Sequence, residues 1–282
     1  MSEKNGANYI DAHVHLWSDD LEKYPLAAEF TPRDMKLSAF SPQELRHYAE
    51  PSGANRFVLV QMSYYGYDNS FMLDVIHESP QDFKGIAVIN WENGSPDVEM
   101  RELAKQGVRG FRIFPERLDD IKQLEGESCY RMFRYSVEAG LTICFLINPE
   151  VLPVVQRLCE KFPGCPVVID HLARIGMAGP IREEDVRSLC LLAKYLGVKI
   201  KLSGFYALGE GKPPHDDLSF LIRRVYEAFG PKRLMWGSDC PFQLMNETYE
   251  NSFELIQNRL DFLSSEDREW ILCRTAEESF FN

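Results

Sequence analysis

Eight apolar runs, spaced along the whole chain, most constrain how these 282 residues can fold. They lie at 9–17, 56–63, 84–90, 108–114, 141–148, 166–172, 198–205 and 233–239. Most are continuously apolar rather than alternating, which is typical of parallel strands that are covered on both faces. The runs therefore predict an α/β protein built on a parallel sheet.

The segments between the runs carry helix signals. Ser41-Pro42-Gln43-Glu44 is a capping box with proline at the first helical position, and glycines end helices shortly before several of the runs. Two more helices are expected near 250–263 and 265–279. Eight strand–helix units of about 35 residues each predict a (β/α)8 TIM barrel, with 1–282 as a single domain. A doubly wound open sheet is the alternative, but no glycine-rich phosphate loop follows any run.

Net charge and cysteine content indicate which partners and which cellular location to expect. The formal net charge is −12, which argues against nucleic acid or an anionic membrane as the partner and leaves a small molecule. The first ten residues lack an apolar signal core, and the seven cysteines are scattered, as in a reduced protein. We therefore expect a cytoplasmic protein, with homo-oligomers left open.

Polar residues stand at the ends of these apolar runs. They are His13, His15, Gln61, Arg112, Asn148, Asp170, His171, Lys201, Ser203 and Asp239. In a barrel of parallel strands, the carboxyl ends of all strands lie at one mouth, and the active sites of such barrels are found there. Buried charges are costly unless they are paired or bound to metal. The sequence therefore predicts one site that gathers these side chains.

The stretch "YIDAHVHLW" places His13 and His15 two residues apart. Alternation along a strand predicts that Asp11 shares their face. With Asp239 these histidines form a metal-binding or acid–base group, and His171 is expected to join it. Asp170 is expected to point to the opposite face of its strand from His171, and therefore to have a structural role as a cap or in an ion pair.

Other strand-end residues are candidates for holding the substrate. Arg112 and Lys201 could bind a carboxylate, with an outward ion pair as the competing interpretation of each. Gln61, Asn148 and Ser203 are further candidate contacts. The connections 18–42 and 208–215 are expected to overhang the mouth.

In combination, these segments resemble the amidohydrolase superfamily, in its amidohydrolase-related branch. The motifs are "IDAHVHLW", "GVRGFR", "VVIDHLAR", "KLSGFYA" and "RLMWGSDCPF", which follow one another from about Tyr9 to Phe281. "QMSYYGYDNSFM" is similar to the segment after strand two in 2-pyrone-4,6-dicarboxylate lactonases. The resemblance implies a barrel, a hydrolytic reaction, and Asp239 as the general acid/base.

The resemblance also bears on metal. Many superfamily members carry a metal-binding histidine or carboxylated lysine on strand four or five, whereas strand five here ends "CFLIN", which argues against two metals. One divalent ion remains, with zinc favoured, held by His13, His15 and Asp239 with His171. A metal-free site stays open, because the lactonase group includes members that work without an ion.

Three functions follow as expectations. The first is hydrolysis of a small lactone, of either the sugar-acid or the dicarboxylate kind. The second is metal-dependent, non-oxidative decarboxylation of a small aromatic or muconate-like acid. The third is a non-catalytic barrel that binds a small acid, because a fold alone does not prove activity.

Overall fold

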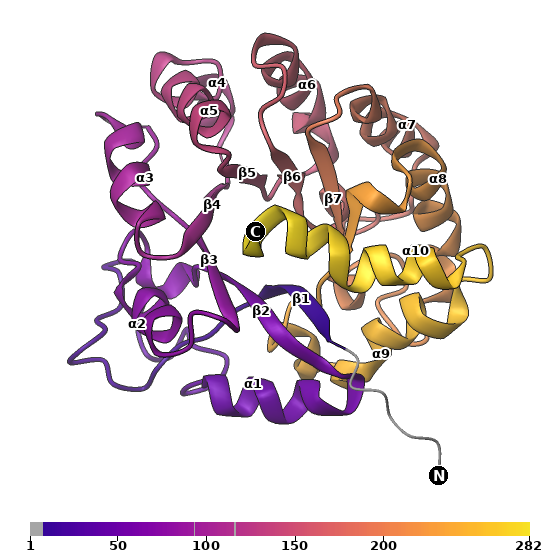
Figure 1. The fold of residues 1–282 in the computed structure, drawn as a ribbon, viewed down its shortest axis with the longest axis horizontal. Coiled ribbons are helices and arrows are strands. Elements are labelled where there is room, and N and C mark those ends of the chain that lie inside the picture. Colours follow the sequence, from indigo (N-terminus) through magenta and orange to yellow (C-terminus); the bar gives the residue numbers. More distant parts are fainter. Residues whose placement is uncertain (1–7, 93, 116) are drawn as a thin grey trace.

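The computed structural model describes residues 8–92, 94–115 and 117–282. Its eight strands form one parallel sheet in the order β1 to β8, as the sequence predicted. The strands are β1 Tyr9–Val14, β2 Ala54–Val60, β3 Phe83–Ala87, β4 Val108–Ile113, β5 Thr142–Phe145, β6 Val167–Ile169, β7 Val198–Leu202 and β8 Leu234–Trp236. Helices surround this sheet, which confirms the (β/α)8 barrel (Figure 1).

The barrel closes where the first strand meets the segment after the last one. Val14 and Cys240 form a parallel bridge. Beside it the His15 N–H donates to the Cys240 carbonyl at 2.8 Å, and the Asp239 N–H donates to the His13 carbonyl at 2.9 Å. Residues expected to carry the chemistry therefore also make the hydrogen bonds that close the sheet. We call this junction the seam.

The helices cover the outside of the barrel. They are α1 Pro42–Ala49, α2 Ser70–Glu78, α3 Pro96–Ala104, α4 Leu118–Gln123, α5 Glu127–Ala139, α6 Leu152–Lys161, α7 Glu183–Cys190, α8 Ser219–Phe229, α9 Tyr249–Glu254 and α10 Ser265–Glu269. The predicted capping box opens α1, where the Ser41 side chain accepts from the Glu44 N–H. In the described parts of the chain, no helix is long and apolar enough to cross a membrane.

The C-terminal helix closes the end of the barrel opposite the predicted site. The helix that starts as α10 continues in π-helical turns to Phe281 and crosses the middle of the barrel in this view (Figure 1). Phe280 is fully buried in one cluster with Ile10, Val58 and Met235. A second, larger apolar cluster includes residues of both the strands and the surrounding helices. The interior is thus packed, and space remains at the other end.

Two long connections lie at that other end. The described residues of 15–41 contain no helix, as expected, and Trp17 pairs with Phe40 at the base of this loop. The loop after β7 is held by a contact of 2.6 Å between His215 Nε2 and Glu247 Oε2, both side chains being buried. It is thereby tied to the loop after β8.

Candidate active site

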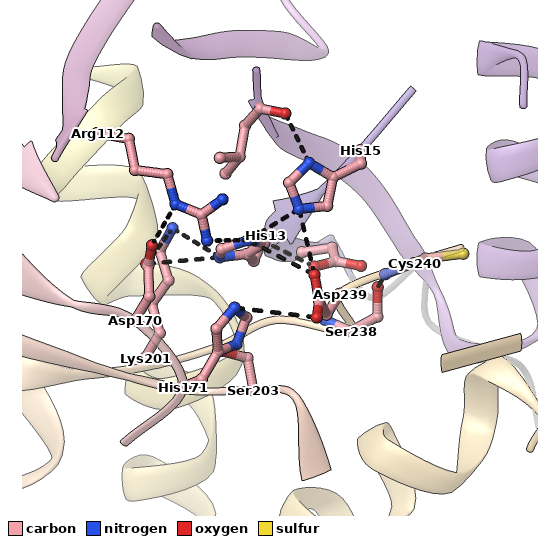
Figure 2. Close-up of polar contacts among 12 residues, drawn as sticks. His13, His15, Arg112, Asp170, His171, Lys201, Ser203, Ser238, Asp239 and Cys240 are labelled. Atoms are coloured by element: carbon pink, nitrogen blue, oxygen red, sulfur yellow. Dashed lines mark hydrogen bonds and ion pairs between the residues drawn. The ribbon is translucent and has the colours of Figure 1, made fainter. Parts of the chain in front are cut away.

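Two histidines and a carboxylate converge at the seam (Figure 2). His13 Nε2 and His15 Nε2 lie 3.3 Å apart. Asp239 Oδ1 is 3.6 Å from the first nitrogen and 3.3 Å from the second. His15 is oriented by its Nδ1, which lies 2.8 Å from the Val60 carbonyl oxygen. The structure therefore brings together the three residues that the sequence grouped.

Asp11 does not join them, and the prediction of a shared face is wrong. Its carboxylate accepts from the N–H groups of His13 and Ser238 and from the Tyr249 hydroxyl at 2.7 Å. The physical reason is local, because the register between β1 and β2 shifts between Asp11 and Val14, so simple alternation fails there. Burial raises the pKa of Asp11 to about 6.

A left-handed turn after β6 delivers the third histidine. The four residues from His171 to Arg174 have φ between 50° and 56°, a conformation that costs non-glycine residues about 1–2 kcal/mol each. His171 Nδ1 lies 2.9 Å from the Ser203 hydroxyl, and its Nε2 lies 3.9 Å from Asp239 Oδ2. Gly204 leaves room for this ring, because a Cβ there would lie 2.8 Å from His171 Nδ1.

Buried charges form a layer beside His13. Asp170 accepts from Arg112 Nε at 3.1 Å and lies 3.2 Å from Lys201 Nζ. Burial by itself would raise the pKa of Asp170, but the interactions with Lys201, His13 and Arg112 together outweigh it and hold the pKa well below its usual range. Asp170 therefore pairs structurally, as its strand parity suggested, and it orients both cations.

His15, His171 and Asp239 open onto a cavity of about 310 Å³. It is lined by His15, Met62, Ser63, Arg112, Phe114, Leu146, His171, Arg174, Met177, Gly204, Tyr206, Ala207, Leu208, Asp239 and Phe242. About half of these side chains are apolar, and most of the polar ones belong to the histidine–aspartate group or contact it. The volume suits one small ligand.

Four residues that the sequence proposed for substrate binding lie elsewhere. Lys201 and Ser203 are completely buried behind His13 and His171. Gln61 donates to the Asp68 carbonyl within its own loop. Asn148 is exposed and lines a neighbouring groove, where the chain turns outward after β5. A position near the end of a strand was therefore not enough to tell residues of the cavity wall from residues buried beneath it.

The sequence interpretation missed Tyr206. Its hydroxyl donates to Asp239 Oδ2 at 2.7 Å and it lines the cavity. The signal was its position three residues after Ser203, just beyond the end of a strand. This bond leaves Asp239 Oδ1 as the oxygen beside the two Nε2 atoms.

The electrostatics keep Asp239 ionised and His13 and His171 neutral. Burial would raise the pKa of Asp239, but the imidazoles of His171 and His15 hold it below its usual range. Burial lowers the pKa of His171 to about 4. Burial and then the charge of Lys201 hold the pKa of His13 well below its usual range.

These residues fit a divalent cation. Asp239 Oδ1 is buried, and no hydrogen-bond donor among the described residues reaches it. Donor atoms of His13, His171 and Asp239 all lie within 4.8 Å of one another, and imidazole with carboxylate is a usual donor set for zinc. The chain thus has a candidate metal site built from histidine and aspartate.

The family model described as amidohydrolase matches residues 10–281. This chain belongs to the amidohydrolase family. The 4-sulfomuconolactone hydrolase of Rhizobium radiobacter is 29% identical over 235 residues, covering 82% of this chain and 75% of that protein. The L-fucono-1,5-lactonase of Burkholderia ambifaria is 28% identical over 239 residues, covering 82% and 80%.

Solved structures agree with the fold. An amidohydrolase from Burkholderia multivorans with bound zinc superposes with a TM-score of 0.81 at 21% identity, covering 98% of this chain and 99% of that one. At this identity the likeness shows the fold, and the zinc belongs to that protein.

Proposed function

We propose that this amidohydrolase opens a small lactone that carries an acidic group. The observation that carries the proposal is Asp239, an ionised buried carboxylate at the base of a cavity of about 310 Å³. One of its oxygens accepts no hydrogen bond from the described residues, and it lies beside His13 and His171, which are neutral. Of the three functions left open by the sequence, lactone hydrolysis is the one that the named relatives support, since they are lactone hydrolases.

Asp239 would serve as general base and then as general acid. Water attacks the lactone carbonyl carbon while Asp239 Oδ1 takes one of its protons. The bond between this carbon and the ring oxygen then breaks, and the same proton passes to the ring oxygen, which gives a hydroxy acid. Tyr206 holds the other carboxylate oxygen throughout.

Arg112 is the candidate for holding an anionic group. Its Nε is fixed by Asp170, and its guanidinium lines the cavity. A guanidinium oriented in this way can donate to a carboxylate or a sulfonate with little loss of side-chain entropy. A flat, acidic lactone would fit between this donor and the apolar wall that includes Phe114 and Phe242.

The candidate ligands of an ion, which we propose to be zinc, are Asp239, His15, His171 and His13. A bound zinc would lower the pKa of water and polarise the carbonyl. We also propose a cytoplasmic location, where the seven free cysteines would stay reduced.

The test compares three purified proteins on a panel of acidic and sugar lactones. Acid release is followed with a pH indicator for the wild type, Asp239→Asn, and Asp34→Asn as an exposed aspartate control. We expect Asp239→Asn to lose about 10²- to 10⁴-fold in kcat and the control to keep full turnover. Full turnover by Asp239→Asn would contradict the assignment. Release of CO₂ from aromatic acids, with no lactone opened, would favour decarboxylation instead.

A further inference from the structure

A buried polar pair joins two loops that wall the cavity. His215 Nε2, in the loop after β7, lies 2.6 Å from Glu247 Oε2, in the loop after β8, and neither side chain is exposed to solvent. Whichever atom carries the proton, one hydrogen bond connects the two loops. Among the described residues, no hydrogen-bond partner reaches His215 Nδ1 or Glu247 Oε1. Buried polar atoms without partners cost stability, so stability alone does not explain this pair.

His215 is connected to Tyr206 through a compact loop. Its ring packs against the buried ring of Phe205, with the two centroids 5.9 Å apart. Tyr206 is the next residue, in a short turn that is closed by a hydrogen bond from the Ala207 N–H to the Gly204 carbonyl. His215 itself has a φ of 62°, a conformation that costs a non-glycine residue free energy. Strain of this kind persists where the surrounding contacts determine the position of the residue.

Glu247 is connected to Asp239 through the other loop. The Glu247 N–H donates to the Gln243 carbonyl at 3.1 Å. The side-chain amide of Gln243 is buried and donates to two backbone carbonyls of the same segment. The preceding residue, Phe242, lines the cavity, and its N–H donates to the Asp239 carbonyl at 3.0 Å. Hydrogen bonds within the segment 239–249 therefore fix Glu247 relative to Asp239.

The same two loops also meet inside the cavity, where the Tyr206 hydroxyl donates to Asp239 Oδ2 at 2.7 Å. We infer that His215 and Glu247 are positioning residues that hold the Tyr206 hydroxyl on Asp239. Neither is among the residues that line the cavity, so they act through the two loops and not on the substrate. A hydrogen bond is directional and sets the separation of the loops, whereas an apolar contact does not. The inference rests on the proposed function only for its effect on turnover.

Amide hydrogen exchange of the full-length protein tests the positioning without a substrate. The double variant His215→Phe/Glu247→Met replaces both polar groups by apolar ones of similar size, so it should keep the fold and the melting temperature. We expect its amides at 207–208 to exchange about tenfold faster or more than those of the wild type. Asp216→Asn is the matched control, because it removes an exposed ion pair with Arg259 from the same loop, and it should leave these amides unchanged. Unchanged exchange at 207–208 in the double variant would overturn the inference.

Turnover then shows whether the pair acts through Tyr206. Glu247→Met leaves His215 Nε2 without its partner and should lower kcat for lactone opening about tenfold at similar KM, whereas Glu247→Gln keeps an oxygen acceptor and should regain most of that loss. In a Tyr206→Phe background, Glu247→Met should lower kcat little further, because residues that act as one unit are not additive. If Glu247→Met does not fold, the double variant with His215→Phe takes its place.

Two results would refute the inference. One is a loss of kcat from Glu247→Met that is as large in the Tyr206→Phe background as in the wild type. The other is a double variant His215→Phe/Glu247→Met with the kcat of the wild type, which would make the pair structural only. If the wild type opens no lactone, the proposed function fails, and the exchange at 207–208 decides this inference alone.

Discussion

Replacing Asp11 with asparagine should stabilise the protein, and by more at high pH than at low pH. Asp11 is fully buried, and its pKa is raised from 3.8 to about 6 in the folded chain because burial disfavours the charged form. An acid with a raised folded-state pKa favours folding fully below the unfolded pKa, and this contribution is lost as the pH rises through the folded pKa. The penalty therefore develops between pH 3.8 and about 6.

The magnitude follows from the two pKa values. The full penalty is about 3 kcal/mol, since each pKa unit is worth about 1.4 kcal/mol. At about pH 5 roughly half of it has developed, and at about pH 8 all of it, so the gain from Asp11→Asn should grow by about 1.4 kcal/mol between them. The asparagine oxygen can still accept from the N–H groups of His13 and Ser238, while its NH₂ can donate to the Tyr249 oxygen.

Urea unfolding at both pH values measures this difference. The wild type supplies the pH dependence of every other group, and Asp19→Asn, at an exposed position, controls for removing a charge. A gain from Asp11→Asn that stays constant between about pH 5 and about pH 8, or that is larger at low pH, would refute the reasoning.

Two further substitutions probe how the site is held. Gly204→Ala should lower both the melting temperature and kcat, because its Cβ would lie 2.8 Å from His171 Nδ1. Gly140→Ala is the control, at a similar positive φ with open space around it. Its free energy of unfolding should fall only by the backbone cost of about 1 kcal/mol, and its activity should stay unchanged. Tyr206→Phe removes the hydroxyl that donates to one Asp239 oxygen, a hydrogen bond worth about 1.5–3 kcal/mol. We expect kcat to fall about tenfold or more at similar KM. An unchanged kcat would mean that the hydroxyl does not orient the carboxylate.

The barrel could be predicted from the sequence because its signal is repeated eight times and each strand is buried on both faces. The convergence of His13, His15, His171 and Asp239 followed from strand polarity alone. The sequence did not predict how deep each side chain lies or in which direction it points, because these depend on more than its position near a strand end. Depth along β7 puts Lys201 behind the site rather than in the cavity.

Local backbone geometry accounts for the other differences. The register shift in β1 sends Asp11 away from the two histidines. The left-handed turn that carries His171 has no glycine, so no residue type in it indicates a positive φ. The position of Tyr206 depends on a short turn after β7, which apolar periodicity does not describe.

The seam has a consequence for biosynthesis. His13 and Asp239 lie far apart in the sequence, and the hydrogen bond between their backbones can form only after Asp239 has been made. Contacts so distant in sequence form slowly, because a loop of more than 200 residues must close first. A nascent or truncated chain that ends before β8 would keep its histidines but lack Asp239. Catalytic competence would therefore arise in one step, together with completion of the barrel.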